Sequence, residues 1–301
     1  MSLAAAAQTS GGGWLPDGHA AALVLTFDVD AEAPILAEGA RYGQRPGLMS
    51  HQAFGPEVGV PRILALLADL ELRATFFVPG LTAERHPQLV EDLLGAGHEV
   101  GHHSYAHARY VTLSEAEERE DFERALDVLR EQGATVSGHR APLSSASMRT
   151  PALVAEHGLA YESTLMDDDR PYILDTGAGE IVELPPFWGL DDWLQYAFLP
   201  DPDIGQRISA PSEVLQGWRD ELDAMRRHRC LCVPAIHPFV SGRAGRLAAL
   251  RTLIEHALEV GDVAILSGAE VAERARQDPT LPRRALADLD PNPDPSIYPI
   301  P

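Results

Sequence analysis

Apolar strand-like runs alternate with helix-like segments along most of this chain. The runs near residues 23–27, 74–78 and 231–236 are apolar throughout, which is typical of strands buried on both faces of a sheet. The clearest helix is predicted at 114–132, where Ser114 begins a capping box. This alternation predicts parallel strands joined by crossover helices, and therefore an α/β fold. Helical spacing is also found near residues 60–70, 87–96, 211–228 and 246–259.

The 301 residues are enough for one large α/β domain, which we place at residues 21–278. Residues 1–20 are small and glycine-rich, and we expect them to form a flexible N-terminal arm. Residues 279–301 carry repeated prolines, which predicts a C-terminal tail without a core of its own.

The formal net charge of −21 argues against a nucleic-acid partner, because phosphate binding needs a basic surface. No apolar run approaches the length needed to cross a bilayer, so we expect no membrane association. The two cysteines, Cys230 and Cys232, lie in an apolar run and are interpreted as buried free thiols. The first residues do not resemble a secretory signal. We therefore expect a cytoplasmic protein.

Four polar clusters each follow a predicted strand, and the carboxyl ends of parallel strands build the active site in such folds. In the first cluster, Asp28 and Asp30 share a face of an extended segment. Two adjacent carboxylates repel each other unless a cation binds or one is protonated. The alternative is that one of them caps the following helix.

The second cluster contains His103 and His107, four residues apart. One helical turn or a compact loop can direct both imidazoles at one ion, and imidazole suits zinc and related metals. The alternative is two unrelated surface histidines, and the position after a strand favours the metal site.

The third and fourth clusters contribute one basic side chain each. Arg140 lies in the sequence GHRAP, and its guanidinium could lower the pKa of a nearby carboxylate and orient it. His237 follows an apolar strand, where histidine could act as a general acid. Taken alone, either residue could have only a structural role.

Taken in order, the motifs TFDVDAE, GHEVGHHSYAH, GHRAP and IHP resemble the polysaccharide deacetylase family, carbohydrate esterase family 4. The resemblance covers roughly residues 20–275 and extends to a cytoplasmic branch that includes peptidoglycan-deacetylase-like proteins and an allantoinase-like ureide hydrolase. The motifs of this branch lie at residues 59–64, 74–80, 161–166 and 183–185 and at His237-Pro238 with Gly242-Arg243.

The resemblance implies a distorted (β/α) barrel with about seven parallel strands. It implies that Asp30, His103 and His107 bind one divalent metal ion, and mixed imidazole and carboxylate ligation makes zinc the expected ion. It further implies that Asp28 is the general base and that His237 is the general acid, with Arg140 holding Asp28. Typical members have adjacent aspartates, whereas Val29 separates them here.

The expected activity is metal-dependent hydrolysis of a non-peptide C–N bond, as in a polysaccharide or N-acetyl-sugar deacetylase. The first alternative is a hydrolase of a cyclic imide or an allantoin-like ureide, which the expected cytoplasmic location favours. The second is a catalytically silent binding protein on the same barrel. Resemblance to the cytoplasmic branch also predicts a homo-oligomer such as a tetramer.

Residues 166–172 and 186–198 are long enough to fold over the strand ends and to form a closed pocket. We therefore expect a small amide, imide, ureide or acetylated sugar as the substrate. A backbone N–H near Tyr105 or Ala106 is expected to assist the oxyanion. Trp188 and Trp193 could equally be packing residues. The predicted substrate-binding residues are Tyr105, Met166, Asp168, Trp188, Asp192 and Trp193.

Overall fold

The computed structural model describes residues 13–205 and 208–289. Its largest sheet has nine strands, and the seven from β12 to β8 in this sheet order, all within the described residues, are parallel to their neighbours. β7 is antiparallel to β8, and β14 is parallel to β7. The order is β12 (Ala235–Ile236), β2 (Thr26–Asp28), β3 (Thr75–Val78), β4 (Glu99–His102), β5 (Gly138–His139), β6 (Tyr161–Glu162), β8 (Glu180–Glu183), β7 (Tyr172–Asp175) and β14 (Arg283–Ala285).

A second, three-stranded sheet precedes the first along the chain direction of two strands. β1 (Ala21–Val24) leads into β2, and β11 (Leu231–Cys232) leads into β12, each after a short break. β1 precedes β2 by one residue, and it pairs with β11 on one side and β13 (Val263–Leu266) on the other. Over the described residues the strands form no closed ring of hydrogen bonds, but a parallel bridge between Asp191 and Ala235 joins the chain after β8 to β12. The predicted distorted (β/α) barrel is confirmed in this open form. A short antiparallel pair, β9 (Leu199–Pro200) and β10 (Asp203–Ile204), lies apart from it.

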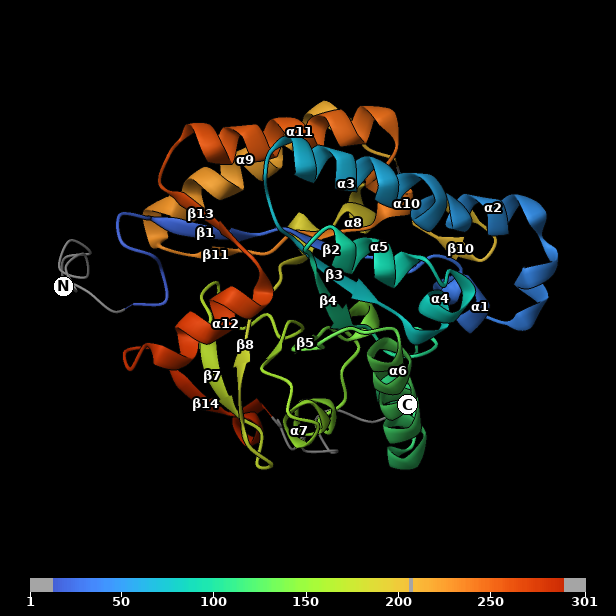
Figure 1. The fold of residues 1–301 in the computed structure, drawn as a ribbon, viewed down its shortest axis with the longest axis horizontal. Helices are drawn as coiled ribbons and strands as arrows, with labels where there is room; N and C mark the ends of the chain where they lie inside the picture. Colours follow the sequence, from blue (N-terminus) through green and yellow to red (C-terminus); the bar gives the residue numbers. More distant parts are fainter. Residues whose placement is uncertain (1–12, 206–207, 290–301) are drawn as a thin grey trace, which may run out of the picture.

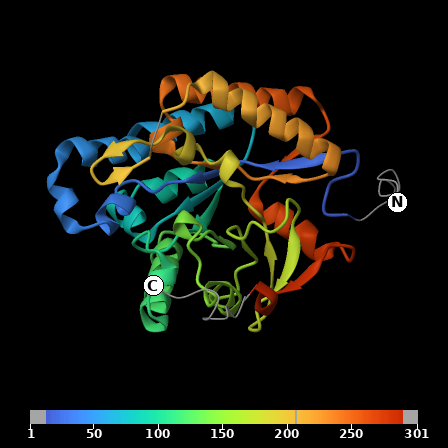
Figure 2. The same cartoon turned by 180° about the vertical axis from the view of Figure 1, so that it is seen from behind.

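Helices cover the sheet between successive strands. Figures 1 and 2 show α9 and α11 side by side along β1, while α12 packs against β6, β7 and β8. The α-helices are α1 (Ala33–Ala37), α2 (Pro46–Phe54), α3 (Val60–Asp69), α4 (Gly80–Arg85), α5 (Leu89–Gly95), α6 (Glu115–Glu131), α7 (Thr150–Glu156), α8 (Asp192–Tyr196), α9 (Pro211–His228), α10 (Pro238–Ser241), α11 (Ala244–Glu259) and α12 (Gly268–Gln277). The 3-10 helices are η2 (Ala40–Gln44), η4 (Tyr110–Thr112), η5 (Pro142–Ser144), η6 (Trp188–Leu190) and η7 (Leu286–Leu289), and η3 (Gly55–Gly59) is a π-helix.

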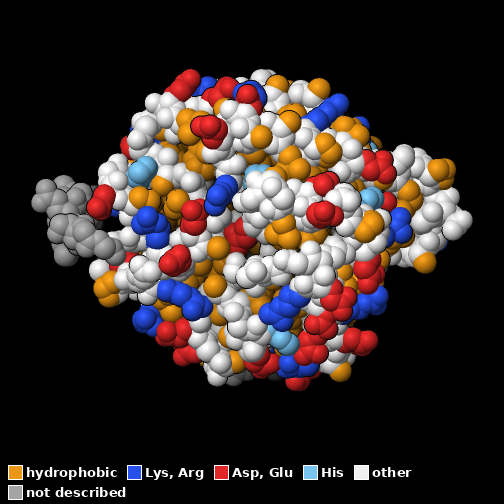
Figure 3. Space-filling model, in the orientation of Figure 1, with side chains coloured by type: hydrophobic (Ala, Val, Ile, Leu, Met, Phe, Trp, Pro, Cys, Tyr) orange, Lys and Arg blue, Asp and Glu red, His pale blue; other side chains and the backbone are white. Residues whose placement is uncertain are grey.

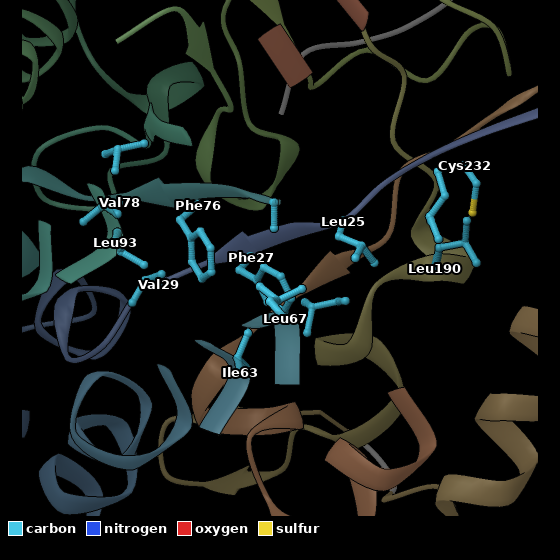
Figure 4. Packing of buried hydrophobic residues seen from close by; sticks show 14 of the residues in the cluster. Leu25, Phe27, Val29, Ile63, Leu67, Phe76, Val78, Leu93, Leu190 and Cys232 are labelled. Atoms are coloured by element: carbon cyan, nitrogen blue, oxygen red, sulfur yellow. The ribbon is translucent and has the colours of Figure 1, made fainter. Parts of the chain in front are cut away.

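The main core lies between the sheet and its helices. The rings of Phe27 and Phe76 stack with their centroids 4.8 Å apart. Figure 4 shows Leu25 and Phe27 beside Ile63 and Leu67 of α3. Since strand side chains alternate between faces, this apolar set turns the intervening polar residues toward the opposite face.

Two segments that were predicted to be peripheral pack onto the body in their described parts. Trp14 and Leu15 are buried, and the Trp14 N–H donates to Asp278. At the other end, β14 adds a strand to the large sheet and Leu286 is buried. The positions of residues 1–12 and 290–301 lie outside the described residues. The division into one domain at 21–278 stays a prediction.

The surface shown in Figure 3 carries acidic and basic side chains interspersed with scattered apolar ones. Within residues 13–205 and 208–289, the structure contains no helix with the length and apolar character that crossing a bilayer requires. Cys230 and Cys232 are buried free thiols, as predicted. Burial raises the pKa of each thiol to about 12, so neither is a reactive thiolate at neutral pH.

Candidate metal centre and catalytic site

The site begins at the carboxyl end of β2. The core residues Phe27 and Val29 alternate with Asp28 and Asp30, so the two carboxylates leave the strand on the face opposite the apolar cluster. Both aspartates are nevertheless buried, with 4% and 2% of their surface exposed. Buried carboxylates need a charged or hydrogen-bonding partner, and each of these two has a different one.

Asp30 lies between two imidazoles. Its Oδ1 is 3.4 Å from His103 Nε2, and its Oδ2 is 3.4 Å from His107 Nε2. One ligand atom from each of Asp30, His103 and His107 lies within 4.8 Å of the other two, and all three side chains are buried. Burial raises the pKa of Asp30, but the two histidines lower it more, so its pKa is below the ordinary value. The carboxylate is therefore ionised, which metal ligation requires.

Asp30 Oδ1 has no hydrogen-bond partner among the described residues, although it is buried. An unpaired buried carboxylate oxygen that faces two imidazole nitrogens fits a cation ligand site. One oxygen and two nitrogen ligands also match the chemistry of zinc and related divalent ions, and three protein ligands leave a position open. The geometry therefore fits the metal site that the resemblance implies.

A compact loop rather than a helical turn brings the two histidines together. Ser104 and His107 have φ values of +62° and +57°, which non-glycine residues rarely adopt. The Ala108 N–H donates to Ser104 Oγ at 2.9 Å and helps to close the loop. Because strained residues persist only where the surroundings hold them, and because they cluster at functional sites, this loop is consistent with a ligand-binding role for its histidines.

The same loop corrects one expectation about the oxyanion. The backbone N–H groups of Tyr105 and Ala106 donate to the Asp121 carboxylate of α6 at 2.8 and 3.0 Å, so they are already occupied. The Tyr105 hydroxyl donates to Glu84, and Arg124 lies over its ring. This residue thus anchors the loop to α4 and α6.

Arg140 links Asp28 to the loop that carries His103 and His107. Its Nη1 donates to Asp28 Oδ1 at 2.8 Å and to Thr26 Oγ1 at 2.7 Å, and its other donors bind Ser163. The His103 Nδ1–H donates to the Arg140 carbonyl oxygen at 2.7 Å, which fixes the ring with its Nε2 toward Asp30. The predicted contact between Arg140 and Asp28 is present.

His237 completes the cluster from the end of β12. Its Nε2 is 3.5 Å from Asp30 Oδ2, and its Nδ1–H donates to Asp192 Oδ1 at 2.7 Å. Burial lowers the pKa of His237, but the hydrogen bond to Asp192 and the charges of Asp30, Asp192 and Asp191 outweigh this effect. The pKa is therefore well above its ordinary value. A histidine that is protonated at neutral pH can donate a proton.

Asp192 has a different role from the predicted substrate contact. It is fully buried, and it also accepts the backbone N–H of His237 at 3.0 Å and the hydroxyl of Ser241. All of these bonds are internal, so Asp192 positions His237. The carboxylate of its neighbour Asp191 lies 3.8 Å from His237 Nδ1. Burial, opposed by His237 and supported by Asp192, raises the pKa of Asp191 to about 6.

Among the remaining predicted substrate residues, Trp193 lies against the cluster. The Trp193 ring packs against His237 at 5.7 Å between centroids. Trp188 is 59% exposed on η6. Asp168 forms an ion pair with Arg284 of β14. Met166 lines a cavity of about 540 Å³ together with Asp167, Asp168, Asp169, Pro185, Pro186, Phe187, Glu221, Met225, Leu231 and Val233.

A second buried group of charges, which was not predicted, lies at the carboxyl ends of β5, β6 and β8. Glu183 Oε1 accepts the N–H groups of Thr164 and Leu165, whereas its Oε2 has no partner among the described residues. Burial and the nearby charge of Glu162 raise the pKa of Glu183 well above its ordinary value. Glu162 itself accepts a hydrogen bond from His139 at 2.7 Å. Both glutamates lie in motifs of the family branch, at 161–166 and 183–185, but the motifs alone do not show that the two side chains meet.

Known proteins resemble this chain in both sequence and fold. Residues 53–161 match the polysaccharide deacetylase family. A peptidoglycan deacetylase from Helicobacter pylori is 28% identical over 262 residues, which cover 78% of this chain and 89% of that protein.

Solved structures extend the similarity over almost the whole fold. A polysaccharide deacetylase homologue from Mycobacterium smegmatis is 44% identical and superposes with a TM-score of 0.86, covering 92% of this chain and 99% of that one. An allantoinase superposes with a TM-score of 0.75 at 23% identity, covering 91% and 96% of the two chains; at this identity the likeness concerns the fold alone. The family match, the full-length relative and the arrangement of Asp28, Asp30, His103 and His107 agree with one another. The chain therefore belongs to the polysaccharide deacetylase family.

Proposed function

We propose that this protein is a metal-dependent hydrolase that removes acetyl groups from N-acetylated sugars by cleaving the amide C–N bond. The observation that carries the proposal is the buried cluster at the strand ends, where Asp30 meets His103 and His107 with one carboxylate oxygen unpaired. The polysaccharide deacetylase match and the peptidoglycan deacetylase relative support this substrate class.

Asp30, His103 and His107 would hold the metal ion, and we propose zinc because the ligands are two imidazoles and one carboxylate. A bound divalent cation supplies Lewis acidity, which lowers the pKa of water and polarises a carbonyl oxygen.

The other residues of the cluster move protons. Asp28, held by Arg140 at 2.8 Å, accepts a proton from the attacking water. His237 stands across the cluster with its Nε2 near Asp30 and its Nδ1–H fixed by Asp192. It donates a proton to the amine nitrogen as the C–N bond breaks. The base and the acid are thus held by different partners, which lets their protonation states differ.

The test is acetate release from chitin oligomers and from the polymer by protein loaded with zinc, with Asp28→Asn as the control. Acetate release that depends on both zinc and Asp28 supports the proposal. Ring opening of allantoin or a cyclic imide, with no acetate release, would replace it by the ureide alternative. An inert protein without bound metal would support the silent binding protein instead.

Three finer expectations accompany the proposal. We expect a short acetylated sugar to be a better substrate than a polymer. The homo-oligomeric state and the cytoplasmic location also stay predictions.

A further inference from the structure

A single π-helical turn lies against the helix that follows His237. This turn, η3, interrupts the path from α2 to α3 and packs on α10, whose N-cap is His237 itself. Isolated π-turns within helices occur frequently at functional sites. Two sequence motifs meet here, at residues 59–64 and at 237–243. Of the residues in them, only His237 takes part in the proton transfers proposed above.

Two glycines allow this close approach. A Cβ atom on Gly59 would lie 2.3 Å from the carbonyl oxygen of Pro238, and one on Gly242 would lie 2.4 Å from the same oxygen and 2.5 Å from Gly59 Cα. Their φ values are −64° and −70°, which every residue adopts readily. Glycine is therefore needed at both positions for space rather than for backbone conformation.

Arg62 fastens the other end of α10. Its Nη1 donates to the carbonyl oxygen of Gly242 at 3.1 Å. The N–H of Gly242 in turn donates to the Pro238 carbonyl oxygen at 2.9 Å. The α10 clamp, which we define as Gly59, Arg62 and Gly242, thus contacts the backbone at both the beginning and the end of this four-residue helix.

We infer that the α10 clamp positions His237 for proton delivery, acting through the peptide of Pro238. Asp192 restrains the imidazole through Nδ1, and the clamp fixes the backbone from which this ring projects toward Asp30. The inference rests on the proposed function, since it assigns the clamp to the acid step of that reaction. The clamp residues are positioning residues and touch no substrate.

The test compares two substrates in the metal-loaded protein. Hydrolysis of an N-acetyl amide requires protonation of the departing amine, whereas 4-nitrophenyl acetate loses a phenolate that needs no proton. A Cβ atom on Gly59 displaces Pro238 by roughly 1 Å, so Gly59→Ala should lower kcat/KM for the amide on the order of 100-fold. The aryl ester should lose far less, and the bound zinc should be unchanged.

Gly95→Ala in α5 is the matched control, because a Cβ atom there has nothing within 4 Å. It should leave the ratio of the two kcat/KM values at the wild-type level. If Gly59→Ala does not fold, Arg62→Gln loosens the clamp without adding bulk and should change the ratio in the same direction. Equal losses on both substrates, or an unchanged ratio in folded Gly59→Ala or Arg62→Gln, would overturn the inference.

A second measurement separates the clamp from the proposed activity. The His237 Nδ1–H, buried and bonded to Asp192, should give a protected downfield proton resonance that depends on the orientation of the ring. Gly59→Ala should shift or broaden this resonance, and Gly95→Ala should retain it. If the wild-type protein hydrolyses neither substrate, the proposed function fails. The clamp is then judged by this resonance, and a resonance unchanged in Gly59→Ala refutes it.

Discussion

Replacing Arg140 by methionine should destabilise the metal-free protein strongly, because it leaves Asp28 charged and buried. The ion pair has only 5% and 6% of its side-chain surfaces exposed, and Arg140 also donates to Thr26 and Ser163. Removing one partner of a buried pair costs about 3–5 kcal/mol, most of it from the uncompensated charge that remains. We therefore expect Arg140→Met to lower the free energy of unfolding by about 4 kcal/mol.

The double variant Arg140→Met with Asp28→Asn removes both charges and should recover part of this loss. Two residues in direct contact commonly show an interaction free energy of 0.5–3 kcal/mol, and we expect about 2–3 kcal/mol here because the pair is buried. Urea unfolding of protein stripped of metal by a chelator measures all four states of the cycle. Additive effects, within about 0.5 kcal/mol, would show that Arg140 does not stabilise the Asp28 carboxylate.

His103→Ala should lose the bound metal, whereas Asp28→Asn should retain it and lose activity by at least about 100-fold; elemental analysis and acetate release measure the two effects, and equal metal content in both variants would reject the ligand assignment. Glu183 has a raised pKa in the folded protein, so the wild type loses stability as pH rises above the ordinary value of 4.5. Glu183→Gln should therefore be more stable than the wild type at pH 7 and no more stable at pH 4, as measured by unfolding at both values; equal differences at the two pH values would contradict the shift. Light scattering at micromolar concentration should give a mass above that of the monomer, and a monomer mass would count against oligomerisation.

Much of the fold follows from local patterns. The apolar run at 74–78 became β3, and the capping box that starts at Ser114 begins α6 as predicted. The predicted strand at 231–236 is divided into β11 and β12, because the backbone of Pro234 lacks the N–H that a continuous ladder needs.

Local patterns could not predict those contacts in the site that join residues far apart in the sequence. Spacing relates His103 to His107, but nothing local relates Asp192 to His237, which lies 45 residues away. Their contact depends on how the chain after β8 meets β12 at the bridge between Asp191 and Ala235. Likewise, Asp121 on α6 takes the loop N–H groups that were expected to face an oxyanion. Occupancy of such groups becomes known only when the tertiary contacts are known.

The pairing of β1 with β13 has a consequence for how this chain is made. Val24 lies opposite Leu266, so β1 is synthesised long before the strand with which it pairs. At about 5–20 residues per second, the ribosome needs on the order of 10–50 s to cover that interval. During this time the entirely buried strand Ala21–Val24 has an unpaired, apolar edge. Nascent or truncated chains that end before β13 are therefore prone to aggregate through this strand.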